Sequence, residues 1–154
     1  MRHTTAAVAV AVAFTAGMFI SPLAQHAFSD ARAQGAPMQA QMIDLAGMKH
    51  GDMPGTGNPE MNGKSLVVTD NATVSVQSGN VGKHMHPNTN EIQYIIEGSG
   101  AMWLGEQRQD FKAGTLIVIP KGTAHGGTIV TSGPVKAIAI KIPPQGKDDV
   151  VFLK

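Results

Sequence analysis

Apolar and polar residues alternate over short stretches along most of the chain after residue 64, and Gly, Pro, Asn or Asp bounds each stretch. A period of two residues with such boundaries is typical of β-strands. No helical period between residues 64 and 154 continues beyond two turns. Gly98-Ser99-Gly100 and Gly105-Glu106 are predicted to form hairpin turns. The predicted strands are 65–69, 73–77, 91–97, 101–104, 115–119, 128–131 and 135–142.

Many short strands in one small domain favour an all-β sandwich or barrel. The chain has 154 residues, including 18 Gly and 9 Pro, so we expect one domain with frequent turns. Residues 64–154 are assigned to this β-barrel domain. Residues 34–63, which are rich in Met, Gly and Pro and have no sustained period, are assigned to a loosely ordered N-terminal segment.

The first 33 residues have the pattern of an export signal. A short basic start precedes the uncharged apolar run 6–20, and Ala31-Arg32-Ala33 offers a small-x-small cleavage site, with Ala27-Phe28-Ser29 as a second candidate. An uncleaved anchor or a core helix is the alternative interpretation. Because the run is shorter than the roughly 20 apolar residues that span a bilayer, we expect export to a periplasm without a stable membrane anchor.

Charge and composition argue against several classes of function. Lys and Arg total 12 against 11 Asp and Glu, so there is no basic field to bind nucleic acid. Cysteine is absent, which excludes disulfides, thiolate metal sites and a cysteine nucleophile. We therefore expect a small-molecule partner rather than a nucleic acid.

The histidines give the strongest chemical signal. His84 and His86 are two residues apart, so on an extended strand their rings point to the same side. Such a pair without other ligands is more often an exposed surface feature. Here the turn sequence Pro87-Asn88-Thr89-Asn90 returns the chain to Glu91, and His125 follows a second turn. Three imidazoles and one carboxylate suit one divalent transition metal (Fe, Mn, Ni, Zn or Cu) better than Ca or Mg.

The spacing of these residues resembles the first motif of the cupin superfamily. That motif has His-x-His, three or four residues, Glu, six residues and Gly. His84, His86, Glu91 and Gly98 match it. The opening Gly of the family motif is replaced by Ser78.

The second cupin motif is also matched. It has Gly, five residues, Pro-x-Gly, two residues and His, and Gly114, Pro120, Gly122 and His125 fall at these spacings. The Asn that often ends this motif is replaced by Ile129. Two motifs in the right order make the resemblance specific.

The resemblance implies a small β-barrel of two antiparallel sheets, a double-stranded β-helix or jelly-roll sandwich, with a metal inside. It implies that His84, His86, Glu91 and His125 are the metal ligands. Glu91 would act as a ligand, which the family pattern favours, or as an unbound general base. Cupins often form homodimers through edge strands, and residues 150–153 are the expected edge here.

The resemblance also raises the question of proton transfer. Gln93 lies where related cupins commonly have a tyrosine, and an amide can hydrogen-bond a substrate but cannot transfer a proton. Glu91 and Gln93 are the candidate catalytic residues, with a polar filler role as the alternative for Gln93. Lyase or isomerase chemistry would then need Glu91, a metal-bound hydroxide or an inner-strand lysine. Tyr94 is expected in the core or at a subunit contact, and either Met102 or Trp103 is expected to face the cavity.

Cupins include dioxygenases, decarboxylases, isomerases and lyases as well as proteins that only bind ligands, so the fold does not decide the function. The intact ligand set favours an exported metalloenzyme. It would act on a small substrate that chelates the metal through a carboxylate or hydroxy-carbonyl group, by lyase, isomerase or dioxygenase chemistry. A non-catalytic periplasmic protein that binds a small molecule or a metal is the alternative. Copper handling by the Met-rich segment 38–61 is a third hypothesis, although methionines that pack across a barrel edge explain that segment more simply.

Overall fold

The computed structural model describes residues 38–154. The export signal predicted for residues 1–33 lies outside the described residues. Within them the only helix is a single 3-10 turn, η1 (His50–Asp52). No helix in this part of the chain is long and apolar enough to cross a membrane.

Strands account for nearly all of the remaining regular structure, as the alternating pattern predicted. The strands, in chain order, are β1 (Met61–Val68), β2 (Thr73–Gly79), β3 (His84–Met85), β4 (Asn90–Leu104), β5 (Gln107–Lys112), β6 (Leu116–Ile119), β7 (His125–Ile142) and β8 (Val151–Phe152).

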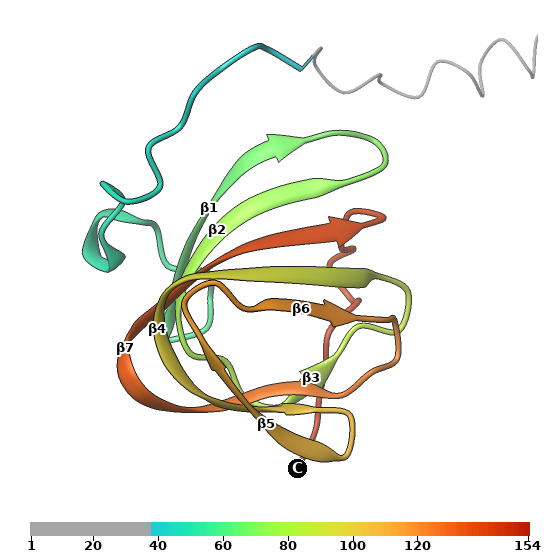
Figure 1. Ribbon diagram of the computed structural model, residues 1–154. Coiled ribbons are helices and arrows are strands. Elements are labelled where there is room, and N and C mark those ends of the chain that lie inside the picture. Colours follow the sequence, from blue (N-terminus) through green and yellow to red (C-terminus); the bar gives the residue numbers. More distant parts are fainter. Residues whose placement is uncertain (1–37) are drawn as a thin grey trace, which may run out of the picture. The chain divides into compact units, whose positions relative to one another are not determined.

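The two longest strands, β4 and β7, bend and run through both layers of a barrel (Figure 1). The first half of β4 and the second half of β7 belong to one layer, sheet I, with the order β1-β2-β7-β4-β6. The other halves belong to sheet II, with the order β8-β3-β7-β4-β5. Every pairing is antiparallel, which confirms the predicted all-β barrel of two antiparallel sheets.

The predicted hairpin at Gly98-Ser99-Gly100 is wrong, because β4 continues through these residues. Gly98 has φ +86°, and a Cβ atom there would lie 2.8 Å from the Cα of Val135 on β7. A Cβ atom at Gly100 would lie 2.4 Å from the carbonyl oxygen of Ile129. The glycines therefore allow β4 to bend and to approach β7 closely. In the sequence, glycines with this role look the same as glycines of a hairpin turn.

Two other strand boundaries also differ from the prediction. Residues 128–131 and 135–142 are parts of the single strand β7, although Gly133 and Pro134 separate them in the sequence. Strand β5 was missed because only Phe111 of its six residues is buried, which leaves no apolar alternation to detect. The hairpin at Gly105-Glu106, which joins β4 to β5, is confirmed.

The core lies between the inner faces of the two sheets. Its buried apolar residues are Ile95, Met102, Phe111, Ile117, Ile119, Val135 and Ala137. Met102 is the member of the expected pair that faces the interior. Trp103 instead lies on the outside between Lys83 and Arg108, whose cationic groups are 4.1 and 4.9 Å from the indole ring. Tyr94 is 47% exposed, so the core is wrong for it, and the subunit contact that was the other expectation stays a prediction.

The N-terminal segment packs against the barrel and is more ordered than predicted. Lys136 is 2% exposed, and its ammonium donates to the carbonyls of Leu45 (2.9 Å) and Met48 (3.2 Å). Met53 is buried, whereas Met42 is fully exposed. Met53 therefore fits the gap-filling interpretation, whereas the exposed Met38 and Met42 do not, and copper handling by the segment stays a hypothesis.

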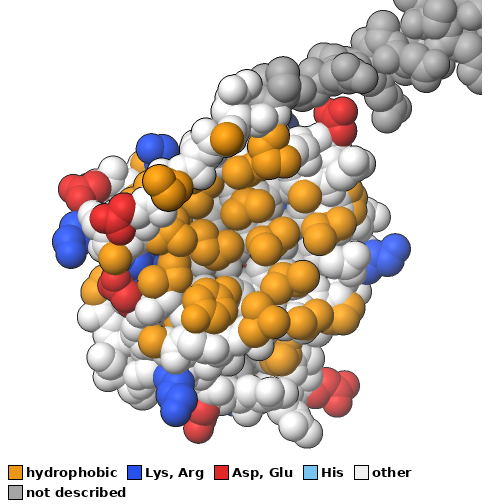
Figure 2. Space-filling view, turned by 45° about the horizontal axis from the view of Figure 1, so that its top comes forward, with side chains coloured by type: hydrophobic (Ala, Val, Ile, Leu, Met, Phe, Trp, Pro, Cys, Tyr) orange, Lys and Arg blue, Asp and Glu red, His pale blue; other side chains and the backbone are white. Residues whose placement is uncertain are grey.

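The outer surface of sheet I carries an uncharged apolar patch. Apolar side chains gather in its middle and charged side chains lie around its margin (Figure 2). We call the following five residues the outer apolar face: Tyr94, Leu116, Val118, Ile140 and Ile142. Leu116 and Val118 are 61% and 59% exposed, so this surface is open in the single chain.

Candidate metal centre

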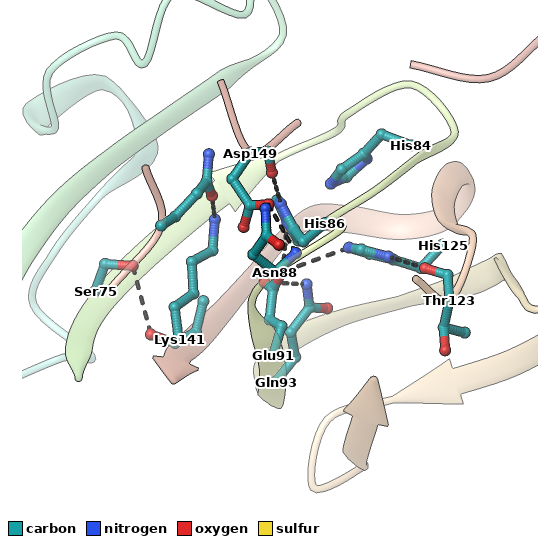
Figure 3. A network of polar contacts seen from close by, with 12 residues as sticks. Ser75, His84, His86, Asn88, Glu91, Gln93, Thr123, His125, Lys141 and Asp149 are labelled. Atoms are coloured by element: carbon teal, nitrogen blue, oxygen red, sulfur yellow. Dashed lines mark hydrogen bonds and ion pairs between the residues drawn. The ribbon is translucent and has the colours of Figure 1, made fainter. Parts of the chain in front are cut away.

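Three buried histidines converge between the ends of β3 and β7 (Figure 3). His84 on β3 is directly opposite His125, the first residue of β7, and such cross-strand partners point to the same side of a sheet. His86, two residues after His84, joins them on that side, as its spacing predicted. One nitrogen from each of the three rings lies within 4.8 Å of the others. This arrangement could hold a metal ion.

Glu91 reaches the same point from the start of β4. Its Oε2 atom is 3.1 Å from Nε2 of His86 and 3.4 Å from Nε2 of His125. The turn after His86 returns the chain to this position, as predicted. Glu91 is 2% exposed, so its carboxylate oxygen and the imidazoles meet out of contact with bulk water.

Each histidine is oriented by a backbone carbonyl. Nδ1 is 2.8 Å from the oxygen of Gly82 in His84, 2.6 Å from that of Asp149 in His86, and 2.9 Å from that of Thr123 in His125. Because a carbonyl only accepts, Nδ1 must carry the hydrogen and donate it. A neutral ring then has its lone pair on Nε2, the form that binds metals. These are backbone equivalents of the partners that usually orient metal-binding histidines.

Several atoms at the centre are buried without a hydrogen-bond partner, and they fit a metal ion. Nε2 of His86, Nε2 of His125 and Oε2 of Glu91 are all in this state. Leaving a buried polar atom unsatisfied costs about 1–3 kcal/mol, so native proteins rarely retain several together. A cation would satisfy the two nitrogen lone pairs and the carboxylate oxygen at once. The nitrogen and oxygen donor set suits a transition metal.

The electrostatics of the centre favour a neutral His84 and an ionised Glu91. Burial, with the neighbouring His125, lowers the pKa of His84 from 6.5 to about 4. Burial acts to raise the pKa of Glu91. The adjacent imidazoles of His125 and His86 outweigh this effect and hold that pKa far below its usual range. Glu91 therefore acts as an anion near neutral pH, which fits a ligand better than a proton donor.

Gln93 contacts the ligand set through Glu91. Its Nε2 atom donates to Oε1 of Glu91 at 2.9 Å, so one carboxylate oxygen is held by Gln93 and the other faces the histidines. Gln93 also lines a small interior cavity of about 50 Å³ beside His125 and Met102. Gln93 was predicted to hydrogen-bond a substrate or to fill space. In the structure its amide group instead orients Glu91, a candidate metal ligand.

Asp149 is a supporting residue that the sequence did not reveal. Its backbone carbonyl accepts the hydrogen bond from His86. Its carboxylate accepts two more hydrogen bonds, from the backbone N (2.8 Å) and the side-chain Nδ2 (3.0 Å) of Asn88. A hydrogen bond from the Thr89 hydroxyl and the contacts from Asn88 lower the pKa of the Asp149 carboxyl group. Asp149 therefore fixes the turn between His86 and Glu91. It is 58 residues after Glu91, and no motif spacing marks it.

Lys141 is the second residue that was not singled out. It is on β7 opposite Glu91, and its ammonium group donates to Oε1 of Gln145. Lys141, Gln145, His84 and His86 line a cavity of about 650 Å³. This volume is within the usual range for small-molecule sites. Lyase or isomerase chemistry was expected to use Glu91, a metal-bound hydroxide or a lysine on an inner strand for proton transfer. Lys141 is such a lysine.

The sequence matches a family model and is similar to a curated protein. The family model described as "Cupin domain" matches residues 60–141. The uncharacterized protein MJ1618 of Methanocaldococcus jannaschii is 34% identical over 71 residues, which cover 46% of this chain and 57% of the relative. The chain therefore matches little more than half of that protein's length.

Solved structures with a similar fold include three bacterial proteins. KdgF from Halomonas sp. has a TM-score of 0.52 at 18% identity, covering 59% of this chain and 87% of that one. Pac13 of Streptomyces, described as a nucleoside dehydratase, has a TM-score of 0.56 at 15% identity, covering 69% and 88%. TT1209 from Thermus thermophilus has a TM-score of 0.53 at 16% identity, covering 68% and 98%. At such identities the likeness shows the fold.

The family match includes both strands that supply His84 and His125 and the turn that leads to Glu91. It also includes β4 and most of β7, the two strands shared by both sheets. Fold, motif spacing and family model thus agree, and the chain belongs to the cupin family.

Proposed function

We propose that this cupin is a metal-dependent enzyme that acts on a small chelating substrate. The observation that carries the proposal is the group of buried, unpartnered atoms on His86, His125 and Glu91 beside the nitrogen of His84. His84, His86, His125 and Glu91 would hold one divalent transition metal. When bound, such an ion supplies Lewis acidity, which polarises a carbonyl or carboxylate oxygen.

The protein's own residues supply orientation and shelter. The carbonyls of Gly82, Asp149 and Thr123 keep the imidazoles in place, and Gln93 fixes one oxygen of Glu91. Burial of Glu91 excludes bulk water from the ligand side of the site.

The large cavity favours an enzyme that acts on a small organic molecule. It reaches His84 and His86 and has room for a substrate with a carboxylate or hydroxy-carbonyl group next to them. Lyase, isomerase and dioxygenase reactions all use substrates of this kind. A non-catalytic binding protein is the alternative, and it would retain its ligand without forming a product.

The first experiment is elemental analysis of the purified protein beside its His125→Ala and His50→Ala variants. We expect close to one transition-metal ion per chain in the wild-type protein and in His50→Ala. His125→Ala should lose most of its metal, because one of the three converging nitrogens is removed. His50 is the matched control, since it contacts Ser78 at 3.2 Å and is not in the cluster.

A wild-type protein that takes up no metal even on reconstitution would contradict the proposal. Metal retained by His125→Ala but lost on deletion of residues 38–60 would favour the Met-rich segment instead. The element found then selects the assay. Iron calls for measurements of oxygen consumption with small acids, whereas Mn, Ni or Zn calls for lyase and isomerase screens.

We also propose that the protein works in a periplasm. The support is the basic start, apolar run and small-x-small cleavage pattern within residues 1–33. Cell fractionation with mass spectrometry of the mature N-terminus tests it, with cleavage after Ala33 as the expected result. Retention of Met1 in the cytosolic fraction would contradict it.

We propose further that two chains form a dimer through the outer apolar face. A two-fold interface brings the same patch of both copies together, so that patch must be complementary to itself. The middle of this face is uncharged, and it therefore meets its own copy without like-charge repulsion (Figure 2). The edge strand expected at residues 150–153 is a poorer surface, because β8 has only two residues.

A further inference from the structure

Lys141 is placed to contact whatever occupies the large cavity. Its partners in the strand register are Glu91 on β4 and Thr73 on β2, so its side chain points to the inner face of sheet I, as that of Glu91 does. It lines the cavity together with His84 and His86. Figure 3 shows the Lys141 side chain at one side of the histidine cluster.

The ammonium group of Lys141 has no carboxylate partner. None of the ion pairs in the described part of the chain includes it, and its hydrogen bond goes to the neutral amide oxygen of Gln145. An ammonium group has three donors, so others remain for a ligand. Burial lowers the pKa of Lys141, whereas the charges of Glu91 and Asp149 act to raise it.

The charge balance of the centre calls for an anion. Glu91 and Asp149 contribute two negative charges and Lys141 one positive charge, and imidazoles that bind a metal ion are neutral and add none. A divalent ion in the proposed site would turn this net charge from −1 to +1. One carboxylate of a substrate would neutralise it.

The cavity wall also favours a carboxylate over a phosphate group. Lys141 is the only Lys or Arg that lines it, and no helix N-terminus borders it in residues 38–154. Phosphate sites usually combine several cationic groups or backbone N–H donors. The side chains of Asn58 and Gln77 lie on the same wall and can hydrogen-bond neutral oxygens of a ligand.

We propose that Lys141 binds a carboxylate of the substrate beside the histidine cluster, and that the substrate is therefore a small organic acid. This inference rests on the proposed function, because it places the substrate next to the metal ligands. It adds a binding residue outside the ligand set. It also narrows the substrate from chelating molecules in general to carboxylic acids.

The test compares lactate with lactamide, which has nearly the same shape and no charge. Isothermal titration calorimetry of the metal-loaded wild-type protein should show tighter binding of lactate, with malate and pyruvate as further acids. Lys141→Gln should weaken the binding of these acids about 10- to 100-fold, as expected for the loss of a charge-assisted hydrogen bond. It should leave lactamide within about threefold. Lys141→Arg should retain the preference for acids. Lys112→Gln, which changes an exposed lysine of β5, should have no effect.

Failure of this inference and failure of the proposed function give different results. Metal content is measured on the same samples, and Lys141→Gln should keep its metal because Lys141 is not in the cluster. The titrations are repeated with metal-free protein, where a Lys141-dependent preference for lactate supports the inference even if the chain retains no metal. Equal binding of lactate and lactamide by the wild-type protein would overturn it, as would no binding of any of the three acids. So would unchanged acid binding by Lys141→Gln or, if that variant does not fold, by Lys141→Met.

Discussion

The histidine cluster depends on one protonation form of its rings. Backbone carbonyls hold the hydrogen on Nδ1 of His84, His86 and His125, and burial keeps His84 neutral at ordinary pH. Neutral imidazole is also the form that a metal binds. The same arrangement therefore suits the binding of a metal ion and makes the metal-free protein sensitive to acid.

The stability of the metal-free protein should fall as the pH falls from about 6.5 to about 4. In this window the unfolded chain binds a proton at His84 that the folded chain does not bind. The free energy of unfolding therefore rises with pH across it, by an amount on the order of 3 kcal/mol. Urea unfolding at several pH values measures the slope.

His84→Gln provides the control for this pH dependence. The variant lacks the titrating ring, so its unfolding free energy should change less with pH between 4 and 6.5 than that of the wild-type protein. Equal slopes for the two proteins would show that His84 binds its proton equally well in the folded and unfolded chains, which would contradict the lowered pKa.

The sequence predicted the candidate ligands but not the residues that support them. His84, His86, Glu91 and His125 are linked by short spacings and turns, and local geometry suffices to bring most of them together. Lys141 is opposite Glu91 only because of a strand register that links residues 50 positions apart. Alternation along one strand does not determine which residue of a distant strand is its partner.

At the level of elements, the bend in β4 is what allows one strand to serve both sheets. Gly98 lies at this bend with φ +86°, against the backbone of β7. The first half of β4 provides Glu91 and Gln93 to the metal centre, and the second half provides Met102 to the core. Gly98, which the sequence predicted to lie in a hairpin turn, is therefore part of a strand in the barrel wall.

Gly98→Ala should destabilise the protein by about 3 kcal/mol, against about 1 kcal/mol for Gly105→Ala. Both glycines have positive φ, so both variants incur the same kind of backbone strain. Only at Gly98 would the new methyl group meet backbone atoms of β7, whereas nothing lies within 4 Å at Gly105. Urea unfolding of the two variants measures the difference, and equal losses would show that β7 does not approach β4 closely here.

Local patterns predicted strands well where one face is buried and poorly elsewhere. The alternation from Glu91 to Ile95 follows the pleat, and those residues form a strand as predicted. Strand β5 has polar residues at four consecutive exposed positions, and its pairing with β4 is what makes it a strand. Its existence depends on a partner and not on its own pattern.

At the scale of the whole molecule, the outer apolar face of sheet I is a surface that residues 38–154 leave uncovered. The N-terminal segment covers the neighbouring region, where Lys136 and Ser78 are buried, but Leu116 and Val118 remain open. Patches of this kind usually mark protein contacts. The contact expected from the sequence at residues 150–153 stays a prediction, since alternation along a strand does not show whether its outer face is open or covered.

Val118→Lys should convert the proposed dimer to a monomer. The substitution places a charge in the middle of the outer apolar face, where two copies would bring like charges together in an apolar contact. Size-exclusion chromatography with light scattering measures the mass. Ile129→Lys is the matched control, because Ile129 is 56% exposed on β7 outside this face and should leave the dimer intact. A wild-type protein that is monomeric at high concentration would contradict the proposed dimer.

Because backbone carbonyls orient the three histidines, the site should tolerate many side-chain substitutions around it. In many metal sites a carboxylate side chain orients the ligand, so one substitution can remove that support. Here the acceptors belong to the peptide groups of residues 82, 123 and 149, which every amino acid provides. Changes of side chain at residues 82 and 123 leave the acceptor in place, whereas insertions or deletions in the same loops displace it. Residue 149 differs, because its carboxylate also binds Asn88. Substitutions that accumulate in such a protein can therefore change the side chains that line the cavity, while the unchanged backbone keeps the imidazole rings in the same orientation.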